Sequence, residues 1–407
     1  MTTARKRNAT SRRADPQPAH ALATLPSRKA LVLQGGGALG AYQAGVYSVL
    51  SERPELPQWI AGVSIGAINA ALIAGNAPDK RVERLRQFWD LVSSGPAQSL
   101  PAWSGERMLL NQWSAGWAAL VGIPGFFAPR MSPELLRGNA ARLLSYYDTT
   151  PLKSTLERLI DFDRINAKEV RLSVGAVNVR TGNSIYFDNM GSEPTTIRAE
   201  HVMASGALPP GFAPVHIDGD DFWDGGVVSN TPLQYVLDNH PRTERLLALQ
   251  VDLFSARGTM PQTLSEVMQR QKDITYSSRT RLNTDVLAAN MNLQQALADL
   301  MTRLPARLRH DPEVAALCAQ LTHEPIDIIH LIYRNKPWEL DSKDYEFSRT
   351  TVDEHWEAGA RDMRNTLAHP EWLHSAGQVN GVTTFDLTEP GQVRVRHPMR
   401  AEPLAKK

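Results

Sequence analysis

A serine stands at the centre of residues 62–66, Gly62-Val63-Ser64-Ile65-Gly66. The G-x-S-x-G spacing is typical of a sharp turn between a strand and a helix, which exposes the serine hydroxyl. A short apolar run from Trp59 precedes this turn, and small apolar residues follow it at 67–74. A serine hydroxyl is a poor nucleophile unless another group takes its proton. The sequence therefore predicts Ser64 as a nucleophile and requires a base elsewhere in the chain.

A glycine loop precedes this serine in the chain. The apolar run at residues 30–34 predicts a buried strand, and residues 40–50 carry apolar side chains at helical spacing. Between them lie Gly35, Gly36 and Gly37, with Gly40 opening the helix. Successive backbone N–H groups without side chains can converge on an oxyanion, and a helix N-terminus behind them adds positive potential. Two adjacent strand–helix units thus supply an oxyanion hole and a nucleophile.

The same glycines also match G-x-G-x-x-G, the fingerprint of dinucleotide-binding proteins. That interpretation requires an acidic residue at the end of the second strand, about 20 residues further on, to bind the ribose. The corresponding position falls near Ile60 and Ala61, and the second strand runs into Ser64 instead. An NAD(P)-dependent oxidoreductase is therefore disfavoured, and no cofactor is expected.

The base could be a histidine or a carboxylate. An α/β-hydrolase would use a late histidine, and several are present, but none lies in an obvious turn motif after a strand. Asp224 gives a sharper signal, because it leads the pair Gly225-Gly226 directly after the apolar hairpin expected around residues 217–222. The glycine pair allows this carboxylate to approach another loop closely.

The same hairpin carries further acids, Asp218, Asp220 and Asp221, which raise the alternative of a calcium site. A calcium-binding EF-hand loop ends on a bidentate Glu at its twelfth position, where this chain has Ser229. No metal is expected.

Three motifs stand in one order along the chain: GGGALG at residues 35–40, GVSIG at 62–66 and DGG at 224–226. Together they resemble the patatin-like phospholipase family, whose members are acyl hydrolases with a Ser–Asp dyad. The resemblance covers roughly residues 29–253 and includes SGALPPGFAPV and NTP near the third motif. The region from about residue 291 resembles a C-terminal extension in one bacterial branch of the family.

The resemblance implies that Ser64 is the nucleophile and Asp224 the general base, with no histidine. It also implies an acyl ester of a lipid as the substrate. A carboxylate is a weak base, but burial raises its pKa and makes it a better one. The implied site residues are the dyad Ser64 and Asp224, the oxyanion-hole residues Gly35, Gly36, Gly37 and Ile65, and the motif glycines Gly40, Gly62, Gly66, Gly225 and Gly226.

One position departs from the family pattern. The glycine loop of the family often has Arg or Lys before its last glycine, whereas this chain has Leu39. The backbone donors do not depend on that side chain, so the oxyanion hole is still expected. No contact between the side chain at position 39 and a substrate phosphate is expected.

Strands that alternate with helices predict an α/β fold. With the resemblance, the expectation is a patatin-like three-layer α/β/α domain with a mainly parallel central sheet. We expect a disordered basic tail at residues 1–28, a catalytic domain at 29–255 and a helix-rich C-terminal extension at 256–407. The expected strands lie at 30–34, 59–61, 170–177, 184–187, 246–253 and 326–332, and the helices at 40–50, 67–74, 81–91, 262–304 and 349–367. The pattern from about residue 369 is weak.

Composition narrows the choice of partners and location. Lys and Arg number 44 against 43 Asp and Glu, and the resulting net charge of +1 is too small for nucleic acid to recognise. The single cysteine, Cys318, excludes an intrachain disulfide and fits a reducing compartment. The basic tail has no apolar segment of a signal peptide, and no stretch suits a membrane span. We expect a cytoplasmic protein whose tail adds weak attraction to the inner face of a membrane; the oligomeric state is left open.

An aromatic-rich stretch from Trp103 to Phe127 lies between the serine and the aspartate motifs. Two interpretations stand equally: a lid or wall for an acyl chain, or ordinary core or a dimer contact. A different class of function is also conceivable, a non-catalytic lipid-binding protein with the same fold. The presence of both Ser64 and Asp224 favours a hydrolase.

Overall fold

The computed structural model describes residues 28–95, 116, 118, 120–130, 144–309, 311–314, 316, 324–334, 339, 343–369, 382–386 and 394–396. Across these residues one ten-stranded sheet has the order β12-β11-β10-β9-β1-β2-β5-β8-β7, with β6 paired to β5. Its strands are β1 (Arg28–Leu33), β2 (Trp59–Val63), β5 (Arg171–Asn178), β6 (Ser184–Asp188), β7 (Val215–Ile217), β8 (Asp220–Asp224), β9 (Leu246–Asp252), β10 (Ile326–Ile332), β11 (Val382–Asp386) and β12 (Arg394–Arg396). A separate pair joins β3 (Ala128–Pro129) to β4 (Tyr147–Asp148).

The centre of the sheet is parallel and its edges are antiparallel. β11, β10, β9, β1, β2 and β5 run parallel to their neighbours, while β12, β6, β8 and β7 pair antiparallel. Every residue of β2, β5 and β9 is buried, because helices cover both faces. The carboxyl ends of β1, β2 and β9 therefore meet at one edge of the sheet, where parallel α/β folds place their sites.

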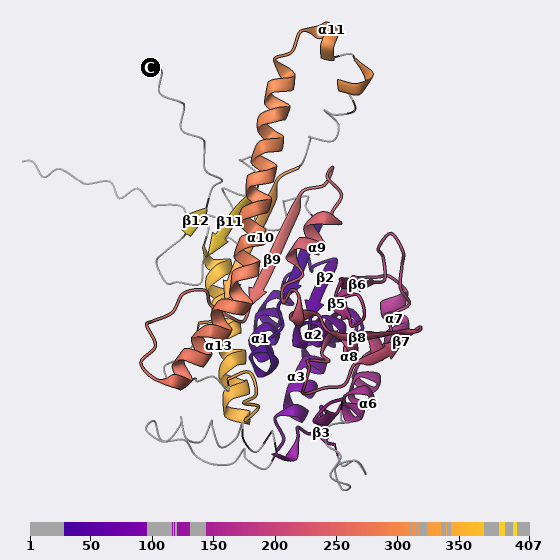
Figure 1. Cartoon of the computed structure of the whole chain (residues 1–407), viewed down its shortest axis with the longest axis vertical. Helices are drawn as coiled ribbons and strands as arrows, with labels where there is room; N and C mark the ends of the chain where they lie inside the picture. The colour runs from indigo at the N-terminus through magenta and orange to yellow at the C-terminus, as the bar shows by residue number, and fades with distance from the viewer. Residues whose placement is uncertain are drawn as a thin grey trace, which may run out of the picture.

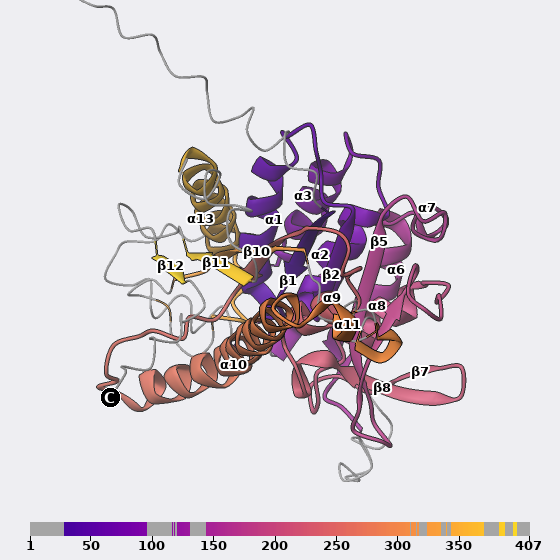
Figure 2. The same ribbon diagram turned by 90° about the horizontal axis from the view of Figure 1, so that it is seen from above.

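Helices cover both faces, as Figures 1 and 2 show. One face packs against α1 (Gly40–Leu50), α2 (Ile65–Ala74), α3 (Arg81–Val92) and α13 (Arg349–Ala368), and the other against α9 (Leu233–Asp238) and the long α10 (Leu264–Thr302). The remaining helices are α6 (Thr150–Leu159), α7 (Phe162–Asn166), α8 (Ala199–Ser205), α11 (Ala306–Arg309) and the 3₁₀ turns η3 (Gly37–Leu39) and η6 (Gly225–Val227). The predicted three-layer arrangement with a mainly parallel sheet is confirmed.

The C-terminal region extends the same sheet. β10 pairs with β9 in register from Ile326 to Ile332, and β11 adds beyond it. α13 packs closely on α1, since a Cβ on Gly45 would lie 1.9 Å from the carbonyl O of Trp356 and one on Gly359 would lie 2.0 Å from that of Tyr42. The proposed boundary at residue 255 stays a prediction, and residues on its two sides share one sheet.

The sequence missed β11 and β12. Their residues follow a stretch of weak pattern, and β11 is held by parallel pairing to β10, which is distant in the chain. The strand expected at 59–61 and the helix expected at 67–74 are each two residues longer in the structure than expected. β2 ends at Val63, and α2 begins at Ile65. Searching the described residues finds no helix that is both long and apolar enough to cross a membrane.

Candidate active site

The turn after β2 holds Ser64 in a strained conformation. Its backbone angles are φ 56° and ψ −127°, in the left-handed region that non-glycine residues rarely adopt. A Cβ on Gly62 would lie 2.3 Å from the carbonyl O of Gly66, and one on Gly66 would lie 2.4 Å from that of Leu33. Only glycines at both positions let the strand, the turn and α2 approach this closely. The predicted strand–turn–helix elbow is present.

A second serine, which the sequence analysis did not single out, fixes this elbow. Ser205, at the end of α8, accepts a hydrogen bond at 2.9 Å from the backbone N–H of Ser64. Its own hydroxyl donates at 2.6 Å to the carbonyl O of Gly175 in β5. The strained peptide is thus tied to the neighbouring strand. Ser205 lies in the SGALPPGF stretch, but nothing in that pattern indicates this contact.

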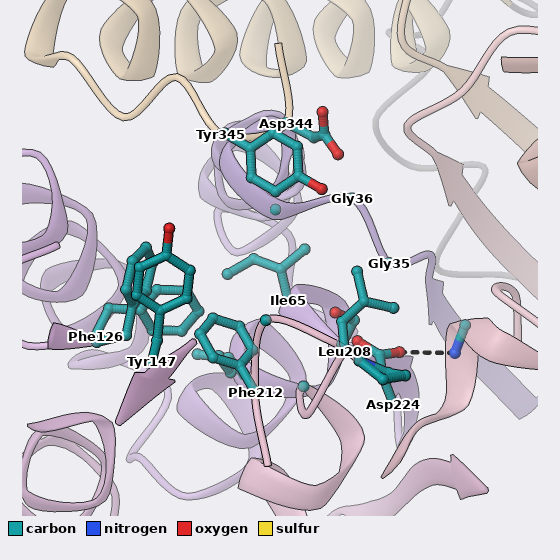
Figure 3. A pocket seen from close by; sticks show the side chains of 18 of the residues that line it. Gly35, Gly36, Ile65, Phe126, Tyr147, Leu208, Phe212, Asp224, Asp344 and Tyr345 are labelled. Atoms are coloured by element: carbon teal, nitrogen blue, oxygen red, sulfur yellow. Dashed lines mark hydrogen bonds between the residues drawn. The ribbon is translucent and has the colours of Figure 1, made fainter. Parts of the chain in front are cut away.

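Asp224 ends β8, which pairs antiparallel with β5. The residue is 2% exposed, and its carboxylate lies close enough to the Ser64 hydroxyl for that hydroxyl to lower its pKa. Its Oδ1 also accepts from the backbone N–H of Gly226 at 2.7 Å, the dashed line in Figure 3. Burial raises the pKa of Asp224 from 3.8 to about 7, against the lowering effect of the hydrogen bonds from Ser64 and Gly226. A carboxyl group with this pKa can accept and return a proton near neutral pH.

The two glycines after Asp224 allow the approach expected of them. A Cβ on Gly225 would lie 2.7 Å from the carbonyl O of Gly175, and one on Gly226 would lie 2.8 Å from Asn230 Oδ1 and 3.1 Å from Asp224 Oδ1. The turn at Asp218 and Gly219, with φ of 49° and 98°, closes the hairpin of β7 and β8 that aims this segment. The sequence predicted this hairpin.

Asn230 joins the glycine loop to the turn after β8. Its contacts correct the expectation that the Gly35 N–H donates to the oxyanion. Its side-chain Nδ2 donates to the carbonyl O of Gly35 at 2.9 Å, and its backbone carbonyl O accepts from the N–H of Gly35 at 3.1 Å. The Gly35 N–H is therefore already engaged, and Gly35 does not act as an oxyanion donor in this structure. A Cβ on Gly35 would lie 2.9 Å from Ser64 Cβ, so this glycine instead permits the loop to lie against the serine.

The other three candidate donors remain available. Among the described residues, no acceptor is bonded to the backbone N–H of Gly36, Gly37 or Ile65. Gly36 and Gly37 lead into η3 and α1, and Ile65 begins α2, so helix N-termini stand behind all three. A Cβ on Gly40 would lie 2.5 Å from Ile65 Cγ1, and this glycine thereby allows the two segments to meet.

A buried polar network supports the loop from behind. Gln34, fully buried, accepts at Oε1 from the backbone N–H groups of Leu253 and Phe254, and its Nε2 donates to Thr231 Oγ1 at 3.0 Å. Gln43 Nε2 donates to the carbonyl O of Gln34 at 2.6 Å. Satisfied buried networks hold one conformation, because breaking any bond leaves a desolvated group unpaired. Leu39, which stands where the family often has Arg or Lys, is fully buried in the hydrophobic core.

A cavity of about 560 Å³ opens over the serine. Its polar end contains Gly36, Gly37, Ser64 and Asp224, and its walls are mostly apolar and aromatic: Ile68, Phe126, Phe127, Tyr147, Leu208, Phe212, Phe254, Tyr276, Tyr345 and Phe347. Figure 3 shows Phe126, Tyr147 and Phe212 on one side and Tyr345 opposite Asp224. Tyr146 and Tyr345 line the cavity yet are 65% and 51% exposed, so they lie at its opening.

The aromatic-rich stretch contributes part of this wall. Phe127 lies 5.3 Å from Phe212 and 4.7 Å from Tyr147, centroid to centroid, and Phe126 lies 6.0 Å from Phe347. These two phenylalanines thus both pack in the core and face the cavity. The tryptophans of the stretch, Trp103, Trp113 and Trp117, fall outside the described residues, so the choice between lid and core stays open for them.

No histidine is among the described residues that line this cavity. The buried ones have other partners: His201 accepts from the N–H of Arg198, and His355 bonds Glu339. Nor do the described residues include a group of three or more His, Cys, Asp or Glu side chains that could hold a metal ion. The carboxylate that lines this cavity with Ser64 at its polar end is that of Asp224.

Comparison with known proteins adds to this geometry. A family model described as Patatin-like phospholipase matches residues 31–237, and a second, described as Patatin phospholipase, matches residues 274–378. The uncharacterized protein YqhO of Bacillus subtilis (strain 168) is 28% identical over 206 residues, which are 50% of this chain and 64% of that protein. The chain thus spans less than two thirds of this relative.

Two solved structures share weak similarity. VipD from Legionella pneumophila is 16% identical with a TM-score of 0.38, over 84% of this chain and 67% of that one. ExoU in its heterodimeric complex with SpcU, from the type III secretion system of Pseudomonas aeruginosa, is 14% identical with a TM-score of 0.27, over 85% and 77%. Neither score is high enough to carry an argument about function.

Proposed function

Because this chain belongs to the patatin-like phospholipase family, we propose that it hydrolyses carboxylic esters of lipids through Ser64 and Asp224. The observation that carries the proposal is that Ser64, on its strained turn, and the buried carboxylate of Asp224 line the polar end of one apolar cavity. An apolar cavity with a few convergent polar groups is the usual form of a small-molecule site.

In the first half of the reaction, Ser64 Oγ attacks the ester carbonyl carbon while its proton passes to the carboxylate of Asp224. The carbonyl oxygen becomes an oxyanion, to which the N–H groups of Gly36, Gly37 and Ile65 donate. Donors that already point at the developing charge need no reorganisation, and one such donor is worth about 3 kcal/mol. Asp224 then returns the proton to the leaving alkoxide, and an acyl-Ser64 ester remains.

In the second half, Asp224 takes a proton from a water molecule that attacks the acyl carbon. A second oxyanion forms at the same donors and collapses to release the fatty acid, while Asp224 gives its proton back to Ser64 Oγ. The raised pKa of about 7 suits both directions of transfer. The bond from the Gly226 N–H keeps the carboxylate in place throughout.

The cavity favours a substrate with an apolar acyl chain. Its aromatic and aliphatic walls would bury the chain beside Ser64, with entry between the exposed rings of Tyr146 and Tyr345. Phospholipid, galactolipid, acylglycerol and storage polyester all present such a chain next to a carboxylic ester. Peripheral contact with the inner face of a membrane and a cytoplasmic location belong to the same proposal.

A fluorophosphonate probe tests this function directly. The probe forms a covalent bond only with an activated serine, so we expect wild type to be labelled and Ser64→Ala not to be. Hydrolysis of p-nitrophenyl esters should fall with the labelling, by about 10³-fold or more. Ser205→Ala is not a suitable control because Ser205 fixes the elbow. Ser229→Ala is suitable, because that hydroxyl lies outside the site.

The non-catalytic alternative makes the opposite prediction. A lipid-binding protein with this fold would bind fatty acid or lysolipid but show neither labelling nor turnover in wild type. That result would reject the hydrolase and retain only the lipid site.

A further inference from the structure

The C-terminal region contacts the glycine loop on both sides of a single residue, Ala38. The N–H of Ala38 donates to the carbonyl O of Asp344 at 2.9 Å. The carbonyl O of Ala38 lies 3.4 Å from Nδ1 of His355. Ala38 directly follows Gly36 and Gly37 in the 3₁₀ turn η3, so both peptide groups of this residue are held by parts of the chain that follow α10.

The contact with Asp344 also explains why Gly37 is a glycine. Gly37 has φ of 55°, and a Cβ there would lie 2.1 Å from the carbonyl O of Asp344. The loop and the residue 344 backbone therefore lie against each other with no space for a side chain. Moving the Asp344 peptide would release both Gly37 and the N–H of Ala38.

Two ion pairs, one half-buried and one buried, fix the Asp344 peptide in turn. Lys272 of α10 donates from Nζ to Asp344 Oδ1 at 2.7 Å. The adjacent pair joins Lys343 Nζ to Asp273 Oδ1 at 2.6 Å, with side chains 1% and 4% exposed. Removing one partner of a buried pair leaves an uncompensated charge, so such pairs hold their backbone in one place. α10 thus anchors the turn at residues 343–345.

His355 of α13 is fully buried between two acceptors. Its Nε2 lies 2.9 Å from Glu339 Oε1, and its Nδ1 faces the carbonyl O of Ala38. Tyr333 donates its hydroxyl to the same carboxylate oxygen of Glu339. These contacts place the imidazole of His355 directly behind the glycine loop.

We propose that Asp344 and His355 are positioning residues, which hold Ala38 so that the N–H groups of Gly36 and Gly37 face the oxyanion. The proposal rests on the hydrolase function proposed above. It makes the C-terminal region part of the catalytic unit. Neither residue exchanges a proton with substrate; each acts through the peptide groups of Ala38.

Two variants of His355 test this with one side chain. In His355→Asn the amide nitrogen can occupy the place of Nδ1 and keep the donor to Ala38. In His355→Gln the longer side chain places the amide nitrogen where Nε2 lies. The donor to Glu339 is then kept, and the donor to Ala38 is lost. We expect His355→Gln to lower kcat/KM by about tenfold, the scale for a misaligned oxyanion donor. His355→Asn should stay within about threefold of wild type, since the donor is retained.

A transition-state analogue separates positioning from general damage. A long-chain trifluoromethyl ketone forms a hemiketal oxyanion with Ser64, whereas the matching ether lipid binds without one. His355→Gln should weaken the ketone by the same factor as kcat/KM and leave the ether unchanged. The control is Asp362→Ala, which removes the 2.9 Å bond that the Tyr42 hydroxyl of α1 donates to α13 but does not touch the loop. It should leave both affinities unchanged.

If His355→Gln does not fold, as judged by its melting temperature, Lys272→Met tests the other contact by releasing Asp344. We expect about a threefold loss in ketone affinity, with ether affinity unchanged. Equal activity in wild type, His355→Gln and His355→Asn would overturn the proposal, and so would equal losses in the two variants or a parallel loss of ether affinity. Failure of wild type itself to react with the fluorophosphonate would reject the hydrolase instead, which keeps the two hypotheses distinguishable.

Discussion

Two regions of the chain build the cavity, and they contribute different things. Residues 28–252 supply the groups proposed to react, each on a turn at the end of a strand: the loop after β1, the elbow after β2 and the turn after β8. Residues 264–369 supply a carbonyl, an imidazole and aromatic rings, from α10, the turn at 343–347 and α13. The first region positions atoms through local backbone geometry, and the second through contacts between distant segments.

This difference teaches where each kind of substitution should act. A change in the first region removes a group that is needed only in the transition state, and the rate falls steeply. A change in the second region shifts a wall or a support, so the losses should be smaller and should depend on the substrate.

The largest effect is expected at Asp224. Asp224→Asn and Ser64→Ala should each lower kcat by about 10³-fold or more, because each removes one half of the same proton transfer. The double variant should lose little more, since residues that act as a unit are not additive. Steady-state kinetics with a soluble p-nitrophenyl ester measure all three.

Histidines from either region provide the comparison. None of the single changes to alanine at His201, His216, His240, His310, His323, His330 or His355 should match the loss at Asp224. His355 alone should show a moderate loss, through the glycine loop. A folded histidine variant as inactive as Asp224→Asn would establish a triad and place a catalytic group outside the motifs.

The pH dependence should report the same carboxyl group. Because burial raises the pKa of Asp224 to about 7, kcat/KM should rise about tenfold per pH unit up to that value and then level. Variants in the second region, such as His355→Asn, should keep this profile. A profile already flat from pH 5 upward would contradict a base with a raised pKa.

The stability of the protein should change in the opposite direction. The folded-state pKa of Asp224 lies above its unfolded value of 3.8, so the folded state favours the protonated carboxyl. The stabilisation that the protonated carboxyl gives the folded state is complete below pH 3.8. It is lost as the pH rises to about 7, at about 1.4 kcal/mol per pH unit. Asp224→Asn should therefore gain up to about 4 kcal/mol of unfolding free energy relative to wild type between these pH values, seen by urea unfolding.

The smallest effect compares one wall residue from each region. Phe212 lies in the first region and Phe347, 6.0 Å from Phe126, in the second, and both line the cavity. Phe212→Leu and Phe347→Leu should each lower kcat/KM for long-chain esters by about fivefold relative to short-chain ones, because an aromatic contact is worth about 1 kcal/mol. Phe385→Leu, a fully buried change away from the cavity, controls for loss of core packing. A shift with Phe212→Leu alone would confine the chain-binding wall to the first region.

Local sequence was sufficient for the first region. The elbow at Ser64, the glycine loop and the hairpin before Asp224 depend on residues a few positions apart, and glycine at fixed offsets is needed wherever the backbone approaches another chain segment closely. The expected strands and helices up to residue 252 are present for the same reason, since their apolar periodicity reflects burial on one or two faces. Within the glycine loop, however, sequence could not reveal that Asn230 occupies the N–H of Gly35.

Contacts between distant segments follow from the tertiary structure alone. The sequence by itself determined which residues could react, because the three motifs encode their turns locally. It did not determine that Ser205 would fix the elbow, that β11 would join the sheet, or that Asp344 and His355 would hold Ala38. Each of these is a contact between segments far apart in the chain, made through a backbone group or a single side chain. Such contacts leave no periodicity or spacing, since proximity in space is set by how helices and strands from distant parts of the chain pack together.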